Sequence, residues 1–269
     1  LQFARCRLTW VLVLAGGARP VQPDLADAPA AFPRLPLWRM ADAEAIRARL
    51  RPGGRITVLG GGTLGIETAL RARETGLVVT LIERQPRLMP AQFSPEGSAA
   101  LLRLLEDRGI AVRPGVNATG AELEGDFAIV TVGARPNVAL AQATGLAVRR
   151  GLATDAQLQT SRPGIFAAGD LVEFPVPTRP CVREAVAQGR TAGANAVAAA
   201  AGRPLTPHTP AFAPLTFKGG DLEIAAAGDP GGTGAEVRLL PDETLPHTYR
   251  ALVLRDGRLE GVQMVGARK

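Results

Sequence analysis

The hydrophobic pattern of the chain is clearest between residues 55 and 83. A β-type run from Ile56 to Leu59 leads into the glycine-rich stretch Gly60–Gly65, and a helical pattern follows it. A second apolar run, Leu77–Ile82, ends on Glu83. Short apolar runs bounded by glycine favour buried strands, so this region predicts a strand, a turn, a helix and a second strand.

Similar elements are predicted on both sides of this region. Residues Ala41–Leu50 have an amphipathic helical pattern. The sequence Ser-Pro-Glu at residues 94–96 is a helix start, because serine caps a helix, proline suits its first position and an acid favours its first turn. That helix is predicted to run to Arg108, and Ile110–Val112 is the next short strand. Alternating strands and helices predict an α/β fold with a parallel sheet and right-handed crossovers.

The last part of the chain, residues 205–266, has the pattern of antiparallel strands. Two apolar runs, Arg250–Leu254 and Leu259–Val265, lie on either side of the sequence Arg-Asp-Gly-Arg. Asp-Gly between apolar runs is a strong signal for a β-hairpin. We therefore expect a small C-terminal antiparallel sheet.

The glycine turn carries the candidate chemistry. Gly60, Gly62 and Gly65 match G-x-G-x-x-G: the first makes the tight turn, the second lets the backbone approach a pyrophosphate, and the third lets helix and strand pack closely. Glu83 lies about 20 residues on, where a carboxylate accepts hydrogen bonds from a ribose 2′-hydroxyl. A strand–helix turn without a ligand is the alternative, but the complete strand–helix–strand context favours a dinucleotide site.

The chain also contains an internal repeat. Val11–Pro20 and Ile129–Pro136 are both apolar strands that run into Gly-Ala-Arg-Pro, where proline ends regular structure. Coincidence in a chain rich in alanine, arginine and glycine is the alternative, but the strand context matches in both copies. The repeat indicates two related nucleotide-binding domains, each ending in the same crossover.

Composition excludes several classes of protein. The 269 residues are 46% hydrophobic, enough for two cores, and no apolar run approaches the roughly 20 residues of a membrane helix. The net charge is +6, but the basic residues are scattered arginines, with only Lys218 and Lys269 as lysines, and aromatic residues make up only 4%. No basic surface with stacking aromatics is visible. We expect neither nucleic acid nor a membrane as a partner.

Cysteine and histidine usage predicts no metal site. Cys6 and Cys181 are far apart, and His208 and His247 are the only histidines, so no cluster has a metal-ligand spacing. The cysteines are better explained as small buried side chains in a reducing compartment. Since no signal peptide is visible either, we expect a cytoplasmic protein.

A second signature follows the second Gly-Ala-Arg-Pro sequence. Thr160–Asp170 predicts a short buried strand ending in Gly-Asp, and a helix is predicted from Arg183 to about Ala201. With these pieces the chain resembles the pyridine nucleotide-disulfide oxidoreductase superfamily of FAD-dependent NAD(P)H oxidoreductases. The resemblance rests on L-V-L-A-G-G-A-R-P, G-G-G-T-L-G-I-E, V-T-V-G-A-R-P-N, T-S-R-P-G-I-F-A-A-G-D and E-A-V-A-Q-G-R-T-A-G.

The C-terminal part narrows the resemblance. L-T-F-K-G-G-D-L-E-I-A-A-A-G-D and Y-R-A-L-V-L-R-D-G-R-L-E-G-V-Q-M-V-G look most like the flavin module of NAD(P)H nitrite reductases and rubredoxin reductases. The implied fold is a Rossmann-like NAD(P)-binding domain inserted in a partial FAD-binding domain, plus a C-terminal antiparallel β interface domain. The implied boundaries are 1–38 for the C-terminal part of the first FAD-domain half, 39–137 for the NAD(P)-binding domain, 138–202 for the second FAD segment and 203–269 for the interface domain.

The resemblance also implies site residues. Gly60, Gly62 and Gly65 would hold the NAD(P)H pyrophosphate, Glu83 the adenosine ribose, and Gly133 would lie against the nicotinamide half. Asp170 would accept hydrogen bonds from the FAD ribityl chain, although a plain turn-capping aspartate is the alternative. Glu67 would orient the nicotinamide or simply favour the helix N-terminus. The remaining cofactor-binding residues implied are Thr63, Leu64, Arg84, Ala15, Gly17 and Gly169.

Departures from the family pattern shape the remaining expectations. The chain shows no FAD strand–glycine–helix unit of its own, so we expect it to be an N-terminally truncated relative. The usual threonine of the first repeat is Gly16 here, and the stretch Val112–Phe127 is too short for a full β-meander.

Three functions stay open from the sequence. The first is an oxidoreductase that moves a hydride from NAD(P)H, with NADH favoured, to FAD and then passes electrons to a partner protein. The second is a non-catalytic nucleotide-binding or interaction module. The third, a disulfide reductase, is disfavoured because neither His208 nor His247 is followed by the expected glutamate five residues later. The interface domain would serve a homodimer or an electron-acceptor partner.

Overall fold

The computed structural model describes residues 10–25, 32–219, 222–240 and 248–267. The chain divides into two compact units. Unit 1 comprises residues 1–19 and 134–213, and unit 2 comprises residues 20–133 and 214–269. Cys6, His247 and Lys269 lie outside the described residues, so the predictions that involve them are not addressed by the structure.

Unit 2 contains a five-stranded sheet in which every neighbouring pair is parallel. From edge to edge its strands are β3 (Arg34–Pro36), β7 (Phe127–Val130), β4 (Arg55–Leu59), β5 (Val78–Glu83) and β6 (Ile110–Pro114). Val58 of β4 and Leu81 of β5 are completely buried. Parallel sheets are covered on both faces, which explains why these strands are nearly continuous apolar runs in the sequence.

Three helices accompany this sheet: α1 (Met40–Arg47), α2 (Thr63–Glu74) and α3 (Pro95–Glu106). They confirm the predicted helices, although α3 ends at Glu106 and not at Arg108, and α1 also ends early. Residues 49 and 50 donate main-chain hydrogen bonds to Ile46 and Arg47, the tighter i→i−3 pattern, so the regular helix ends at Arg47 and not at Leu50. A tightened last turn is common where a following proline disfavours continued helix.

The strand order creates a topological switch point between β4 and β7. The chain passes from β4 to β5 and β6 on one side and then returns to β7 on the other side of β4. In open parallel sheets, ligands bind outside the carboxyl ends of the strands at such a point. Three segments leave the sheet there: the glycine turn after β4, Glu83 at the end of β5 and residues 131–133 after β7.

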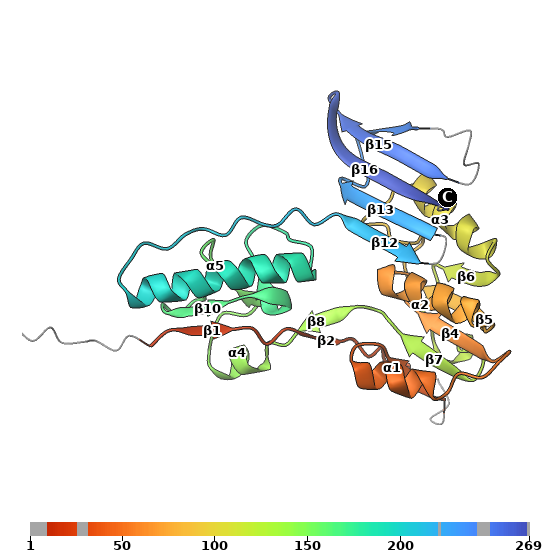
Figure 1. Ribbon diagram of the computed structural model, residues 1–269, viewed down its shortest axis with the longest axis horizontal. Helices are drawn as coiled ribbons and strands as arrows, with labels where there is room; N and C mark the ends of the chain where they lie inside the picture. The colour runs from red at the N-terminus through yellow and green to blue at the C-terminus, as the bar shows by residue number, and fades with distance from the viewer. Residues whose placement is uncertain (1–9, 26–31, 220–221, 241–247, 268–269) are drawn as a thin grey trace, which may run out of the picture. The chain divides into compact units, whose positions relative to one another are not determined.

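The C-terminal part of unit 2 is an antiparallel sheet, as predicted (Figure 1). Its strands, in spatial order, are β12 (Leu215–Gly219), β13 (Leu222–Gly228), β16 (Arg258–Ala267), β15 (Tyr249–Arg255) and β14 (Glu236–Leu239). Asp256 and Gly257 join β15 to β16 with φ angles of 49° and 73°. Both angles are positive, as the two central residues of a type I′ hairpin turn require.

The two sheets of unit 2 share one hydrophobic core. Phe217 and Ile224 of the antiparallel sheet belong to the same buried cluster as Ile66 of α2 and Leu101 of α3. Helix α3 also packs directly against β15 and β16. The C-terminal sheet is therefore integrated with the parallel sheet by helix α3 and does not form a core of its own.

Unit 1 is built from two short parallel strand pairs and a long helix. Strand β1 (Leu12–Leu14) pairs with β10 (Ile165–Ala167), and β9 (Leu152–Ala153) pairs with β11 (Val172–Glu173). Helix α5 (Val182–Ala200) packs on β1 and β10, as Figure 1 shows. The unit also contains the short helix α4 (Ala139–Ala143) and a 3-10 turn, η2 (Gly169–Leu171). The predicted Gly-Asp signature thus forms strand β10 and η2.

The two Gly-Ala-Arg-Pro repeats form strands that pair with each other. They are β2 (Ala18–Pro20) and β8 (Ala134–Pro136). The main-chain N–H of Val21 donates to the Gly133 carbonyl, and that of Asn137 donates to the Gly17 carbonyl, each at 2.9 Å. These two bonds show that the strands run in opposite directions. The repeat therefore marks two of the three places where the chain passes between the units.

The connection from β6 to β7 is short, as expected from the sequence. Residues 115–126 contain one 3-10 turn, η1 (Gly120–Glu122), and no strand. Val116 and Leu123 of this connection pack with Leu25 on a small cluster that includes Leu59 and Val130. This loop, together with Leu25, thus covers the apolar side chains near the carboxyl ends of β4, β5 and β7 on one face of the sheet.

No helix within the described part of the chain is long and apolar enough to cross a membrane.

Candidate dinucleotide sites

The turn after β4 depends on two glycines for packing inside the protein. Gly60 has a φ of 103°, and a Cβ there would lie 2.7 Å from the Thr131 carbonyl oxygen. A Cβ on Gly65 would overlap the carbonyl oxygen of Gly60. The Thr131 hydroxyl donates to the Leu59 carbonyl at 2.7 Å, which holds β7 against the turn. Gly60 and Gly65 are therefore required by the fold itself.

Gly62 is different, because nothing in the protein requires a glycine there. Its φ of −80° and ψ of −177° suit any residue, and a Cβ would meet no protein atom within 4 Å. Gly61, in contrast, is confined by Leu88 and Glu83, whose atoms a Cβ would approach to 2.5 and 3.0 Å. The open space in front of Gly62 lies at the start of α2, where a ligand can approach the main chain.

The N-terminus of α2 is left free for an anion. Helices α1, α3 and α5 each have an acid in the first turn, namely Asp42, Glu96 and Glu184. Helix α2 has none, and its N-cap, Gly62, has no side chain to accept from the first N–H groups. Unsatisfied N–H groups and the positive end of the helix dipole together favour a phosphate.

Glu83 lies beside this turn with both carboxylate oxygens engaged. Oε2 accepts from the Gly61 N–H at 2.6 Å, and Oε1 accepts from the Gln85 N–H at 2.7 Å. The side chain is half-buried, and each oxygen retains a second lone pair. The carboxylate is thus fixed next to the open space at Gly62 while it can still accept from a hydroxyl group.

Two arginines near Glu83 have different surroundings. Arg84 is exposed, and no hydrogen bond of its guanidinium with the described residues is found. Arg87 lies close in sequence to the same site, but its guanidinium donates to the Phe93 and Pro90 carbonyls and to Ser98 Oγ. Arg87 therefore holds the loop before α3.

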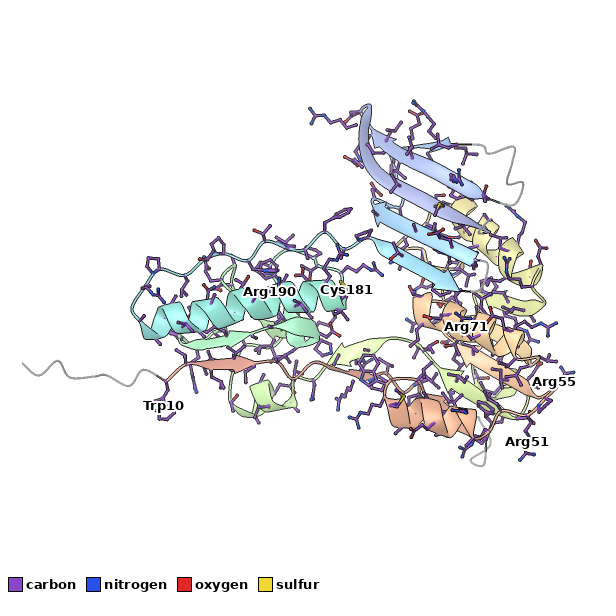
Figure 2. The ribbon with its side chains drawn as sticks, viewed as in Figure 1. Trp10, Arg51, Arg55, Arg71, Cys181 and Arg190 are labelled. Carbon is purple, nitrogen blue, oxygen red and sulfur yellow. The ribbon has the colours of Figure 1, made fainter. Side chains whose placement is uncertain are left out.

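Thr63, Leu64 and Glu67 occupy the first two turns of α2. Leu64 and Glu67 line a groove of about 640 Å³ between α1 and α2, and Ile129 of β7 also lines it. Arg71, labelled in Figure 2, lines the same groove from the next turn of α2. Glu67 therefore faces the β7 side of the turn, whereas Glu83 comes from β5.

Gly133 ends the segment that follows β7. It has a φ of 100°, and its carbonyl accepts from Val21. Its neighbour Val132 is 40% exposed. The structure thus places Gly133 at the same edge of the parallel sheet as the glycine turn and Glu83.

In unit 1 the carboxyl ends of β1 and β10 lie side by side. Leu14 pairs with Ala167, and the Ala168 N–H donates to the Leu14 carbonyl at 3.0 Å. The chain then enters Ala15–Gly17 from β1 and Gly169–Asp170 from β10. The predicted residues Ala15, Gly17, Gly169 and Asp170 are therefore brought to one edge, although β1 and β10 are far apart in the sequence.

This edge has the chemistry of half a dinucleotide site. Asp170 is half-exposed, and no hydrogen bond of its carboxylate with the described residues is found. Gly169 has a φ of 79°, so its tight turn needs a glycine. A carboxylate next to small residues suits the hydroxyl groups of a sugar-like chain. No strand–glycine turn–helix unit for a pyrophosphate is present among the described residues of unit 1.

Sequence reasoning missed the side chains that support these turns. Thr131 holds Gly60, and Gln188 of α5 accepts from the Gly169 N–H at 2.8 Å. Neither belongs to a short local motif, since each acts on a residue brought close only by the fold. Across the described residues, no group of three or more potential metal ligands is found.

Comparison with known proteins agrees with this geometry. Residues 10–200 match the family described as pyridine nucleotide-disulphide oxidoreductase. The probable ferredoxin reductase CtmF of Castellaniella defragrans is 32% identical over 279 residues, which cover 95% of this chain and 66% of that protein. The nitric oxide reductase FlRd-NAD(+) reductase of Salmonella agona is 34% identical over 178 residues, 61% of this chain and 46% of that protein.

A solved structure shows the same fold. The ferredoxin reductase for the CYP199A2 system from Rhodopseudomonas palustris superposes with a TM-score of 0.80 at 29% identity, covering 95% of this chain and 66% of that one. This chain thus spans about two thirds or less of the length of the three relatives. By the family match over residues 10–200, the chain belongs to the pyridine nucleotide-disulphide oxidoreductase family.

Proposed function

We propose that this chain forms part of an FAD-dependent NAD(P)H oxidoreductase that passes electrons to a partner protein. The observation that carries the proposal is Gly62, a glycine that the fold does not need, at the free N-terminus of α2. A bound pyrophosphate requires a main chain without a side chain at the helix N-terminus, because its oxygens must come close to the N–H groups there.

The nicotinamide nucleotide would be held by unit 2. The main chain of Gly62, Thr63 and Leu64 would bind the pyrophosphate, because their N–H groups begin α2. Glu83 would accept from the 2′-hydroxyl of the adenosine ribose, which favours NADH over NADPH. Glu67 and Gly133 would border the nicotinamide half, and Arg84 would lie near the adenosine end.

FAD would be held by unit 1. When bound, FAD supplies the hydride-accepting and electron-releasing chemistry of the reaction. The part of this chain is to orient it: Asp170 would accept from the ribityl hydroxyls, and the main chain of Ala15, Gly17 and Gly169 would pack against it. The half-exposed carboxylate of Asp170 at the β1–β10 edge supports this assignment.

The proposed electron acceptor is a small redox protein, since the relatives of this chain are named as reductases of ferredoxin and of FlRd. We assign the docking of this partner, or of a second copy in a homodimer, to the C-terminal sheet. Leu259 and Val262 of β16 are 59% and 39% exposed, which supports an interface there. The free thiol of Cys181 supports a reducing, cytoplasmic location.

The second candidate, a nucleotide-binding module without catalysis, is favoured by one observation. The described residues of unit 1 contain a single pair of strands at the proposed flavin edge and no pyrophosphate turn. Flavin absorbance of the purified protein, an NADH titration and NADH-dependent dye reduction separate the two candidates. NADH binding with flavin and dye reduction, in the chain alone or once a strand–glycine–helix FAD segment is supplied, supports the oxidoreductase. NADH binding without them in both cases supports the module.

A further inference from the structure

Helix α5 buries a row of polar side chains. Glu184, Gln188 and Asn195 are 3%, 3% and 1% exposed. Their spacings of four and seven residues place them on one face of the helix. Burying polar groups is costly unless each is hydrogen-bonded, so the partners of these side chains show what the row does.

Glu184 accepts three hydrogen bonds in this buried site. Its Oε1 accepts from Gln188 Nε2 and from His208 Nε2, both at 2.9 Å, and its Oε2 accepts from the Ala211 N–H at 2.7 Å. Burial raises the pKa of Glu184, but the hydrogen bonds from Ala211, His208 and Gln188 outweigh it and hold the pKa below its ordinary value. Glu184 is thus a carboxylate acceptor for three donors.

The Glu184 carboxylate determines which way the Gln188 amide points. Gln188 Oε1 accepts from the Gly169 N–H at 2.8 Å, and its Nε2 donates to Glu184. A main-chain N–H can only donate, so the bond to Gly169 requires the Gln188 oxygen on that side, and the buried amide nitrogen then needs an acceptor on the other side. Glu184 is that acceptor, and it is itself oriented by His208 and Ala211.

This network ends at the turn that carries Asp170. Gly169 and Asp170 open η2 directly after β10, and Gly169 has a left-handed φ of 79°. We infer that Glu184 and Gln188 are positioning residues, which hold the Gly169–Asp170 turn in the geometry that presents the Asp170 carboxylate to the flavin. His208 anchors the pair from the segment after α5. This inference rests on the proposed function for its flavin part only.

Asn195 provides a matched control on the same helix. Its Nδ2 donates to the Gln157 and Thr206 carbonyls at 2.8 Å, and its Oδ1 accepts from the Thr206 N–H at 2.9 Å. It ties α5 to the segment after it, as Glu184 does, and it is equally buried. Since no hydrogen bond between Asn195 and Gly169 or Gln188 is found, its loss should destabilise the unit without releasing the turn.

The test exchanges the carboxylate of Glu184 and the amide of Gln188. In Glu184→Gln, the new amide keeps its oxygen toward the Nε2 atoms of Gln188 and His208 and turns its nitrogen toward the Ala211 N–H, so the bond to Ala211 is lost and the bond between Gln188 and Gly169 is retained. In Gln188→Glu, two carboxylates face each other. The double variant Glu184→Gln/Gln188→Glu restores an acceptor for Gly169 and a donor for the new carboxylate, so it should recover the contact. Such recovery is not expected of groups that merely fill space.

Two measurements on the full chain test whether the Gly169 turn is held and whether FAD binding depends on it. Amide hydrogen exchange at Gly169, followed by NMR, should be at least tenfold faster in Gln188→Glu, near the wild-type rate in Glu184→Gln and in the double variant, and unchanged in Asn195→Ala. Titration with FAD to millimolar concentration, followed by the chemical shifts of Gly169 and Asp170, should show a dissociation constant raised about tenfold in Gln188→Glu and restored in the double variant.

The two measurements separate the possible failures. Wild-type exchange at Gly169 in Gln188→Glu, or no recovery in the double variant, overturns the positioning role. If the exchange pattern holds but FAD binds the wild type and the single variants equally, the turn is positioned but not for the flavin. If FAD shifts no resonance of the wild type, the proposed flavin site itself is wrong while the positioning of the turn stands.

Discussion

The main-chain N–H of Gly61 donates to Glu83 Oε2 at 2.6 Å. This bond ties the turn after β4 to the end of β5, so the proposed pyrophosphate and ribose contacts are parts of one rigid arrangement. Together with the hydrogen bond from the Gln85 N–H to Oε1, it holds the carboxylate toward the turn.

We predict that NADH binds more tightly than NADPH. The Glu83 carboxylate repels a 2′-phosphate and accepts from a free 2′-hydroxyl, and Arg87 is held by the Phe93 and Pro90 carbonyls, so it cannot neutralise the phosphate. The preference should be at least about tenfold, or about 1.4 kcal/mol. Parallel titrations of the two nucleotides measure it, and Arg84→Ala should leave NADH binding within about twofold. Equal or tighter binding of NADPH would contradict the prediction.

Gly62→Val should abolish nucleotide binding while the protein stays folded. A Cβ at this position would meet no protein atom within 4 Å, and the cost of valine at the N-cap position is only about 1 kcal/mol, but the side chain would fill the space of the pyrophosphate. NADH titration and thermal unfolding measure the two effects separately. Survival of binding to within a few-fold would mean that the turn is purely structural.

Gly65→Ala is the matched control for this experiment. Its Cβ would overlap the Gly60 carbonyl oxygen, so we expect loss of stability as well as of binding. The contrast between a folded Gly62 variant and a destabilised Gly65 variant distinguishes a ligand contact from a packing contact.

Ser94 and Tyr249 should be energetically coupled. The Ser94 hydroxyl caps α3 by accepting from the Gly97 N–H and lies 2.8 Å from the Tyr249 hydroxyl of the C-terminal sheet. Tyr249→Phe should cost about 1 kcal/mol, and Ser94→Ala more, because it removes both a cap and a buried partner. Urea unfolding of the two single variants and the double variant should give a coupling of about 0.5 kcal/mol or more. Strict additivity would show that the contact contributes nothing.

Alkaline pH should destabilise unit 2 through Tyr249. Burial raises the pKa of Tyr249, outweighing the hydrogen bond to Ser94 that lowers it. A group whose pKa is raised by folding contributes stability that is complete below its unfolded pKa, about 10, and is lost as pH rises through the folded pKa. Tyr249 is the only tyrosine, so phenolate absorbance reports on it alone. Its appearance at or below the pH of a model peptide, in folded protein, would contradict this prediction.

The polypeptide of residues 1–269 should bind nicotinamide nucleotide well and FAD weakly. The strand–glycine turn–helix unit at Gly60–Gly65 is complete, whereas the described part of unit 1 offers the Asp170 carboxylate without a pyrophosphate turn. Pyrophosphate contacts at a helix N-terminus are a major anchor for a dinucleotide. Purified protein should therefore contain little flavin and show little diaphorase activity, as judged by absorbance and dye reduction. Supplying a strand–glycine–helix FAD segment, in cis or as a second polypeptide, should restore both. Stoichiometric FAD in the isolated chain would refute this prediction.

The local elements of this protein were predictable from its sequence. The strand–turn–helix at residues 55–74, the capped start of α3 and the Asp-Gly hairpin each depend on residues close together in the chain. Hydrophobic period, capping residues and turn glycines act over a few residues, so their physics is readable without the fold.

The roles of individual site residues could be anticipated only in part. The glycine pattern distinguished Gly60, Gly62 and Gly65 from their neighbours, but Gly61 counted as a variable position. The structure shows that Leu88 and Glu83 exclude a side chain there, and that Gly62 alone faces open space. Arg87 is close to Glu83 in the sequence, but its carbonyl partners come from a loop whose path the sequence pattern does not specify.

The tertiary structure alone decided the long-range relationships. Pairing of β2 with β8 explains the Gly-Ala-Arg-Pro repeat, and the contact of Gln188 with Gly169 joins a helix to a turn 19 positions earlier. The anchoring of α3 on the C-terminal sheet joins Ser94 to Tyr249 across 155 positions. Such contacts depend on how the elements pack, and side-chain hydrogen bonds between distant segments leave no periodic signal. The sequence by itself therefore determined the elements and the nucleotide turn, while packing determined which side chains support them.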